Sequence, residues 1–175
     1  SPNQGQSFGL VGGMNLCDRL SLQMEGMIQN ENGQNYKEYS DGQVINNQIH
    51  LDYASLNILG RYEWFRNNFL MPISHHIVLG IYGSYLKNGW QELDGTRANL
   101  RTAYKDHDLG MILGYEFDTP LTQKFILSGG FRFDPGFLNI YDGVPSLPAN
   151  LNKTYSSSFN FNISIKYNLT RIMHK

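Results

Sequence analysis

Alternation of apolar and polar residues is the feature that most restricts the fold of this chain. In residues 155–169 the odd positions are almost all apolar or aromatic, whereas the even positions carry serine, asparagine and one lysine. Successive side chains of a β-strand point to opposite faces, so a strand separates the two sets, whereas a helix would mix them. The pattern therefore predicts a strand with one apolar face and one polar face.

The same period of two recurs upstream. It is clear in residues 20–28, 56–64, 109–117 and 125–133, and less clean in 75–85. Predicted strands therefore cover residues 6–16, 20–36, 44–65, 74–87, 104–118, 122–134 and 154–169. Short links near 17–19, 66–72 and 118–120 alternate with long polar links near 30–47, 87–106 and 135–153. Short turns at one end and long loops at the other are typical of outer-membrane β-barrels.

Composition agrees with such a barrel and argues against several other classes. The chain has 18 Gly, 11 Tyr and 10 Phe but only 17% charged residues, which suits a barrel wall. Its mean hydropathy of −0.39 fits a wall in which only alternate residues face lipid. No stretch approaches the ~20 apolar residues of a spanning helix. A net charge of −1 without a basic run argues against a nucleic-acid partner, and the single cysteine, Cys17, excludes an internal disulfide.

We therefore predict an all-β fold, a small antiparallel transmembrane β-barrel that forms a single domain over residues 1–175. Its predicted location is the bacterial outer membrane, where it would contact the lipid bilayer and lipopolysaccharide. The pattern contains seven strands, whereas single-chain bacterial barrels close with an even number. We expect an eighth strand ahead of Ser1, with both ends of the full barrel in the periplasm.

Charged residues on the polar parity form the sharpest candidate site. An interior of about eight strands is just wide enough for side chains to fill it. Opposite charges there are expected to pair, because an unpaired buried charge is strongly destabilising. We predict a structural salt-bridge plug, and a gate or ligand site is the alternative. The predicted network comprises Glu25, Arg61, Glu63, Glu116, Lys124, Arg132 and Lys166.

Aromatic residues gather near predicted strand ends, as in the two interfacial girdles of membrane barrels. The short-turn girdle comprises Tyr62, Trp64, Phe65, Tyr115, Phe117 and Tyr167, and the loop-side girdle comprises Tyr53, Tyr85, Trp90, Phe133 and Tyr155. A carbohydrate-stacking surface is the alternative. Phe137, Leu138 and Ile140 fit neither interior nor girdle, and we expect them in the last long loop, capping the barrel or contacting a partner.

Metal and catalytic sites are not expected. His75 and His76 are adjacent, so in a strand they point to opposite faces and do not readily share one ion. Ser74–His75 and His107–Asp108 provide catalytic residue types, but their spacing does not align nucleophile, base and acid on one face. We therefore predict no metal, no cofactor and no enzymatic activity.

Several stretches together resemble the PorT-like outer-membrane β-barrel family, known from bacteria that use type IX secretion. They are residues 20–28 (LSLQMEGMI), 53–63 (YASLNILGRYE), 80–86 (GIYGSYL), 108–117 (DLGMILGYEF) and 130–140 (GFRFDPGFLNI). The family's usual first strand has no counterpart here. The resemblance implies an eight-stranded barrel, and members range from secretion-machinery components to proteins of unknown role.

Three functions follow as hypotheses. The first is a non-enzymatic accessory or structural subunit of an outer-membrane assembly, such as a secretion or protein-export machine, with outer-membrane or periplasmic proteins as partners. The second is a narrow pore or small-ligand-binding barrel, and the third is an enzyme that modifies outer-membrane lipid. A soluble lipocalin-type barrel would share the alternation but bury its apolar face inside.

Overall fold

The chain forms one antiparallel sheet, as the alternation predicts. The computed structural model describes residues 5–40, 43–67, 72–93, 96–99, 101–140 and 155–167. Its elements are β1 (Gln6–Asn15), β2 (Leu20–Ser40), β3 (Gln43–Asn67), β4 (Ile73–Leu93), β5 (Thr96–Asn99), the 3₁₀ turn η1 (Arg101–Ala103), β6 (His107–Pro120), β7 (Phe125–Asn139) and β8 (Tyr155–Tyr167). The all-β prediction is confirmed. In the described ranges there is no helix long and apolar enough to cross a membrane.

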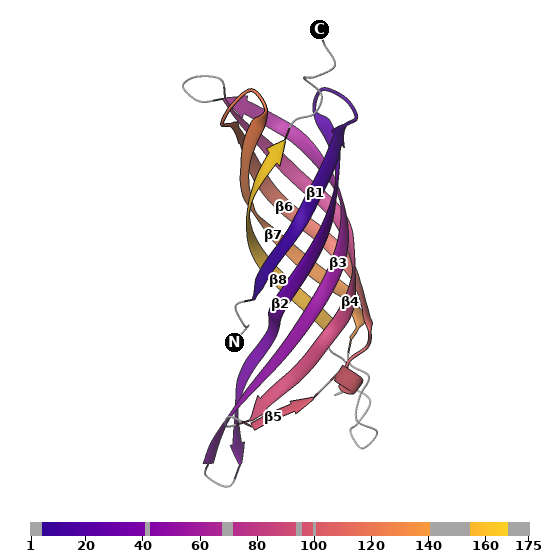
Figure 1. Ribbon diagram of the computed structural model, residues 1–175, viewed down its shortest axis with the longest axis vertical. Helices are drawn as coiled ribbons and strands as arrows, with labels where there is room; N and C mark the ends of the chain where they lie inside the picture. The colour runs from indigo at the N-terminus through magenta and orange to yellow at the C-terminus, as the bar shows by residue number, and fades with distance from the viewer. Residues whose placement is uncertain are drawn as a thin grey trace.

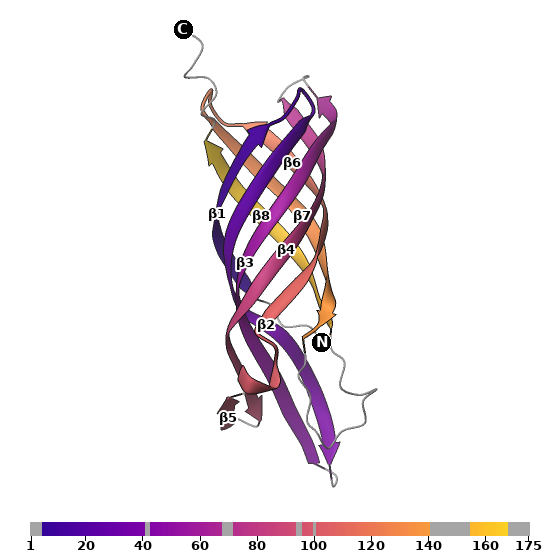
Figure 2. The same ribbon diagram turned by 90° about the vertical axis from the view of Figure 1, so that its right-hand side faces the viewer.

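The sheet curls into a barrel-like wall. Its strand order is β1-β2-β3-β4-β6-β7-β8, and the short β5 pairs only with β4. Figures 1 and 2 show the strands tilted around a common axis. We call the end with the β1/β2 and β6/β7 connections the short-turn end, and the opposite end the loop end. The seven-strand path matches the seven predicted strands.

Side-chain burial follows the alternation. Along β8 the residues alternate strictly between exposed and half-buried positions. On β3 the outward Leu56 and Ile58 are 53% and 39% exposed, whereas the inward Asn57 and Leu59 are 6% and 0% exposed. The apolar parity thus faces outward and the polar parity inward. This arrangement is the inverse of a lipocalin-type barrel.

The strands at the loop end are longer than predicted. β2 and β3 stay paired as far as Ser40 and Gln43, and β4 continues to Leu93 before β5 pairs back onto it. The predicted loops 30–47 and 87–106 were therefore wrong in large part. Residues 30–40 are polar on both parities, and a strand without an apolar face carries no alternation to detect. The paired segment beyond the bulge at Gln29/Asn32 forms an extended hairpin, visible at the bottom of Figure 1.

The curled sheet has an open seam between its first and last strands. Among the described residues β1 pairs with β2 and β8 with β7, and their arrows run in the same direction (Figure 2). Outward side chains at the seam are unusually exposed: Leu10 is 85%, Phe161 82% and Ile163 84% exposed. By contrast, Leu79 on the central strand β4 is only 57% exposed, because neighbouring strands cover it on both sides. The eighth strand stays a prediction.

Candidate functional site: a charge network in the interior

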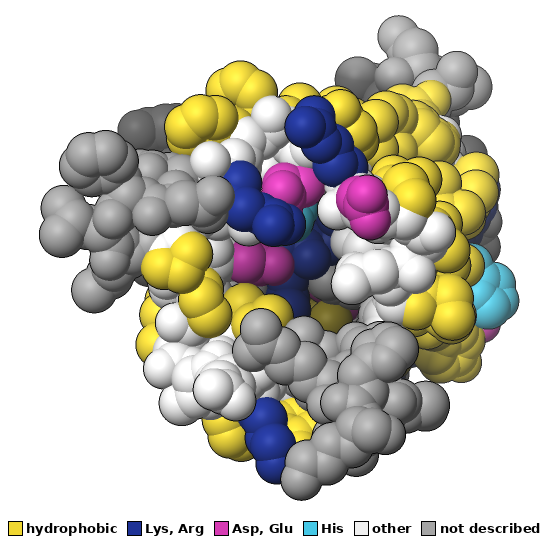
Figure 3. All heavy atoms as spheres, turned by 90° about the horizontal axis from the view of Figure 1, so that it is seen from above, with side chains coloured by type: hydrophobic (Ala, Val, Ile, Leu, Met, Phe, Trp, Pro, Cys, Tyr) yellow, Lys and Arg dark blue, Asp and Glu magenta, His cyan; other side chains and the backbone are white. Residues whose placement is uncertain are grey.

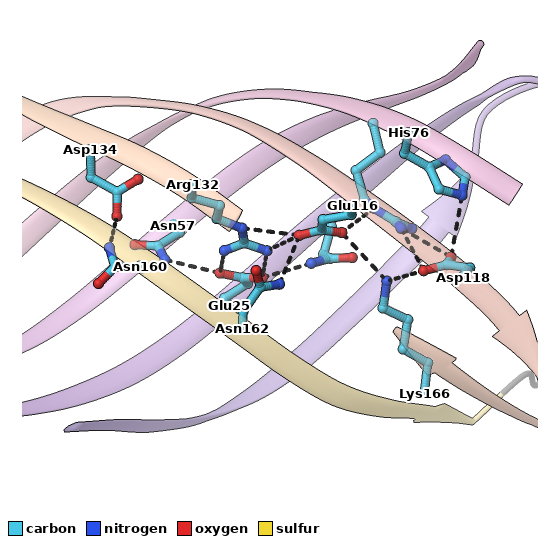
Figure 4. A network of polar contacts seen from close by, with 12 residues as sticks. Glu25, Asn57, His76, Glu116, Asp118, Arg132, Asp134, Asn160, Asn162 and Lys166 are labelled. Atoms are coloured by element: carbon cyan, nitrogen blue, oxygen red, sulfur yellow. Dashed lines mark hydrogen bonds and ion pairs between the residues drawn. The ribbon is translucent and has the colours of Figure 1, made fainter. Parts of the chain in front are cut away.

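Arg132, on β7, connects two acidic residues inside the sheet. Its Nη1 and Nη2 lie 2.7 and 2.8 Å from the two carboxylate oxygens of Glu25, on β2. Its Nε donates to Glu116 on β6 at 3.0 Å, and Nη2 also bonds Glu116. Figure 4 shows the guanidinium between the two carboxylates. One arginine therefore ties together three strands, the first and last of which lie far apart in the sequence.

Arg61, on β3, makes a second bridge toward the short-turn end. Its Nε donates to Glu116 at 2.9 Å, and its Nη2 donates to both oxygens of Asp118 at 2.9 Å. Lys166 Nζ, on β8, lies 3.3 Å from Asp118 and 3.8 Å from Glu116. His76 Nε2 lies 3.4 Å from Asp118. Asp118 thus receives three basic groups from three different strands.

Neutral side chains satisfy the remaining carboxylate sites. Gln23 and Asn57 donate to Glu25 at 2.6 and 3.0 Å, and Asn162 donates to Glu116 at 3.2 Å. The side chains of Glu25 and Glu116 are only 3% and 1% exposed. Glu25, Glu116 and Asp118 face Arg61, Arg132 and Lys166, so the formal charges of these six residues cancel. Asp134 is bonded to Asn160 and does not take part in these ion pairs. Paired charges with satisfied hydrogen bonds are the form in which ionic groups are tolerated in an interior.

Glycines opposite the large inward side chains make room for this network. Arg132 pairs in register with Gly114, and Glu116 with Gly130. A Cβ on Gly114 would lie 2.8 Å from Cγ of Arg132, and one on Gly130 would lie 2.8 Å from Cγ of Glu116. Each long side chain therefore lies across the backbone of a glycine on the next strand.

Five of the predicted network residues meet in this cluster: Glu25, Arg61, Glu116, Arg132 and Lys166. Glu63 lies at the short-turn mouth and pairs instead with the exposed Arg66 at 2.7 Å. Lys124 is exposed in the turn between β6 and β7 and is not part of the cluster, because β7 begins one residue later, at Phe125. Figure 3 looks into this mouth, where acidic and basic side chains gather inside a rim of hydrophobic ones.

Sequence reasoning missed Asp118 and His76. Asp118 was assigned to a short link, but β6 continues to Pro120 and directs it inward beside Arg61. His76 was placed opposite His75 without a role. Asp118 shares the inward parity of Glu116 on β6, and His76 shares that of Val78 on β4. Extending the alternation by two residues on each strand would therefore have found both.

Truncating Arg66 tests how little the ion pair at the short-turn mouth contributes to the stability of the fold. The Arg66 side chain is 53% exposed and its pair with Glu63 spans three residues of one strand. Because solvent-exposed ion pairs contribute about 0–1 kcal/mol, Arg66→Ala is expected to change the free energy of unfolding by less than about 1 kcal/mol. Urea unfolding in detergent measures the change, and a larger loss would place Glu63 and Arg66 in the network after all.

Two further layers fill the interior toward the loop end. Leu59, Val78 and Ile112 form a buried apolar cluster with Tyr82 packed against it. Tyr82 Oη then donates to Asp108 at 3.1 Å and lies 3.0 Å from Ser156 Oγ.

The candidate catalytic pairs do not assemble. Ser156 bonds Asp108, but His107 lies on the outer face, against the ring of Tyr85 at 5.4 Å. His75 also faces outward and contacts Tyr115, whereas its neighbour His76 faces inward. Among the described residues no three His, Cys, Asp or Glu side chains form a metal-ligand group.

Most predicted girdle residues project from the outer face. Exposed outward aromatics are Tyr62, Trp64, Phe65, Phe117, Tyr167, Tyr85, Phe133 and Tyr155. Tyr115 is half-buried among outward rings, 5.6 Å from that of Phe131. Phe133 opposes Leu113, at the middle of β6, and so lies midway along the wall.

Two aromatics assigned to the loop-side girdle lie elsewhere. Tyr53 is buried inside with Leu51 and Leu86, so its girdle assignment was wrong. Trp90 stacks on the buried His50 at 3.7 Å. The register between β3 and β4 shifts at Asp52/Tyr53, where Lys87 has no opposite partner in the pairing. Such a bulge moves the following residues of β4 to the other face.

The expected partner-contact loop was also partly wrong. β7 continues to Asn139, so Phe137 and Leu138 lie on a strand, where they are 54% and 42% exposed. Ile140 is 3% exposed and its carbonyl accepts from Lys105 N at 2.7 Å, which removes it from any contact surface. The rest of that loop, residues 141–154, lies outside the described residues.

In comparisons with protein families, curated proteins and solved structures, nothing matched this chain. The resemblance to the PorT-like family therefore stays a prediction that rests on the stretches quoted above.

Proposed function

We propose that this chain is a non-enzymatic β-barrel of the bacterial outer membrane and a structural subunit of an outer-membrane assembly. The observation that supports this most is the charge-balanced network that fills the interior of a wall with an apolar outer face. The resemblance to the PorT-like family suggests a secretion or protein-export machine as the assembly.

The outer face fits a lipid bilayer in chemistry and in height. Leu79 and Ile81 are 57% and 55% exposed at the centre of β4, where water would disfavour them. The aromatic row at His75 and Phe117 and the row at Tyr85 and His107 are separated by ten residues along both strands. At ~3.3 Å per residue and a tilt of about 40° this gives about 25 Å, the height of the apolar band of membrane barrels.

The filled interior argues against a pore. Arg61, Arg132 and Lys166 come from three different strands and all pair with Glu116. An ion that crossed the barrel would therefore find few unpaired charges in the interior. Ser74 and Ser128 pair in register with Asp118, and His76 lies 3.4 Å from it. Arg61 and Lys166 hold the same carboxylate, so this group belongs to the interior network and not to a lipid-facing rim, which argues against the lipid-modifying enzyme. A structural role requires neither an open pore nor a catalytic group.

In planar bilayers the protein is expected to give no stable conductance steps, because Arg61 and Arg132 lock Glu116 in the centre. Arg61→Ala with Glu116→Ala removes a cation and an anion together, and the expected result is a measurable rise in current. Arg97→Ala, on the exposed β5, is the matched control. A wild-type channel that neither variant alters would favour the pore hypothesis instead.

Purification from native outer membranes tests the assembly. Extraction is expected to require detergent, and the protein is expected to elute as part of a larger complex with reproducible partners. A protein that is monomeric under the mildest extraction would contradict the structural-subunit role. Extraction without any detergent would contradict membrane insertion itself.

A further inference from the structure

A shallow groove crosses the outer face near the loop end. Its hollow measures about 580 Å³. Leu56, Gly83 and Leu109 lie side by side in register on β3, β4 and β6, and form its apolar floor. A Cβ on Gly83 would meet no atom within 4 Å, so this glycine leaves a notch between the two leucines. The notch is wide and apolar, which suits a hydrocarbon chain.

Tyr85 and His107 close the groove toward the loop end, and a second, polar hollow adjoins it there. This hollow measures about 420 Å³ and is lined by Arg101, Thr102, Tyr104, Lys105 and Asp106. Arg101 joins the two hollows: its Nη2 lies 3.4 Å from Tyr85 Oη, and its guanidinium lies 5.7 Å from the centre of that ring. The apolar groove thus continues into a polar recess at its loop end.

Basic groups outnumber acidic ones around the recess. Arg101 and Lys105 line it together with one acid, Asp106. Asp108 lines the neighbouring groove, but its carboxylate is buried and bonds Tyr82 and Ser156. Asp106 accepts a hydrogen bond from Arg101, and this bond raises the pKa of the guanidinium, which therefore stays charged. Arg101 keeps donors beyond those used for Asp106 and Tyr85, because a guanidinium carries five N–H groups.

We infer that this groove binds an anionic, phosphate-bearing lipid, with one acyl chain on the floor at Gly83 and the phosphate at Arg101 and Lys105. The inference rests on the proposed membrane location, because the row of Tyr85 and His107 then lies at the outer interface, where lipid phosphates lie. Charge complementarity selects the headgroup, and the notch selects the chain.

Native mass spectrometry of the detergent-solubilised protein tests this with two lipids of identical chains, dimyristoyl phosphatidylglycerol and dimyristoyl phosphatidylcholine. The wild type is expected to retain the anionic lipid preferentially. A basic residue near a membrane surface contributes a factor of about five in lipid affinity. Arg101→Gln is therefore expected to reduce retention about fivefold, and Arg101→Gln with Lys105→Gln about 25-fold.

Filling the notch tests the chain-binding part separately. Gly83→Leu is expected to reduce retention of both lipids, since it occupies the floor. Gly12→Leu, on β1 and equally free of neighbours, is the matched control and should leave retention unchanged. Arg97→Gln is the control for charge, because Arg97 is 70% exposed on β5, over the ring of Trp90.

The outcomes separate this inference from the proposed function. A protein that requires detergent but shows no preference between the lipids, or loses none in Arg101→Gln, contradicts the lipid site alone. Displacement of the lipid by millimolar inorganic phosphate, with no effect of Gly83→Leu, would show a free-anion site instead. A protein extracted without detergent would overturn the membrane location and the lipid site together.

Discussion

Replacing Arg132 with methionine is expected to lower the free energy of unfolding by about 3–5 kcal/mol, the range for breaking a buried ion pair. The change removes the cation that the structure gives Glu25, whose side chain is 3% exposed, and one of the cations at Glu116. Methionine keeps most of the volume, so the loss reports on charge rather than on a cavity. Urea unfolding in detergent, followed by tryptophan fluorescence, measures it.

The double variant Arg132→Met with Glu25→Gln is the decisive companion. It removes the partner that would be left unpaired, so most of the lost stability is expected to return. Arg97→Met, on an exposed residue, should change stability by less than about 1 kcal/mol. If Arg132→Met behaves like Arg97→Met, the network is not what holds the interior together.

Replacing Gly130 with valine is expected to have the second-largest effect. Its Cβ would fall against the carbonyl oxygen of Tyr115 and lie 2.8 and 2.9 Å from Cγ and Cα of Glu116. Backbone cannot move aside as a flexible side chain can, so the strands must separate and Glu116 must leave its arginines. We expect a loss at or above the upper end of the about 1–3 kcal/mol typical of overpacking.

Gly26→Val is the matched control for this substitution. Gly26 faces outward on β2, and a Cβ there would meet nothing within 4 Å. The protein should fold and keep near wild-type stability, as measured by urea unfolding and by the mobility shift of unheated samples in gel electrophoresis. Equal losses at Gly26 and Gly130 would mean that valine disturbs the strands generally, and that Gly130 does not serve to accommodate Glu116.

The faces of the sheet could be predicted from the sequence, but the contacts inside could not. Alternation alone places Glu25 and Arg132 on the same face. It does not reveal that they meet, because the two residues are 107 positions apart and their strands face each other only once the sheet curls. The curvature of the sheet and the register of its strands determine which inward residues meet. The alternation within a single strand indicates neither of them.

Bulges account for other differences. After the shift at Lys87, Gly89 is buried, whereas its neighbours Asn88 and Trp90 are exposed and half-buried. The period-two pattern of the sequence does not predict this change. The expected loop at Phe137 and Leu138 was wrong for a related reason. Pro135 and Gly136 are typical turn residues, yet here they lie within β7, where the register with β8 shifts between Pro135 and Asn139.

The extended hairpin ends far from the interior network. Asn32–Ser40 pairs with residues 43–51, and nine residues at ~3.3 Å each give a length of about 30 Å from the bulge to the end of β2. A macromolecule bound at the tip would stand a membrane's thickness away from Arg132 and its carboxylates. Tip residues can therefore change without disturbing the interior, so one invariant wall could carry many different tips.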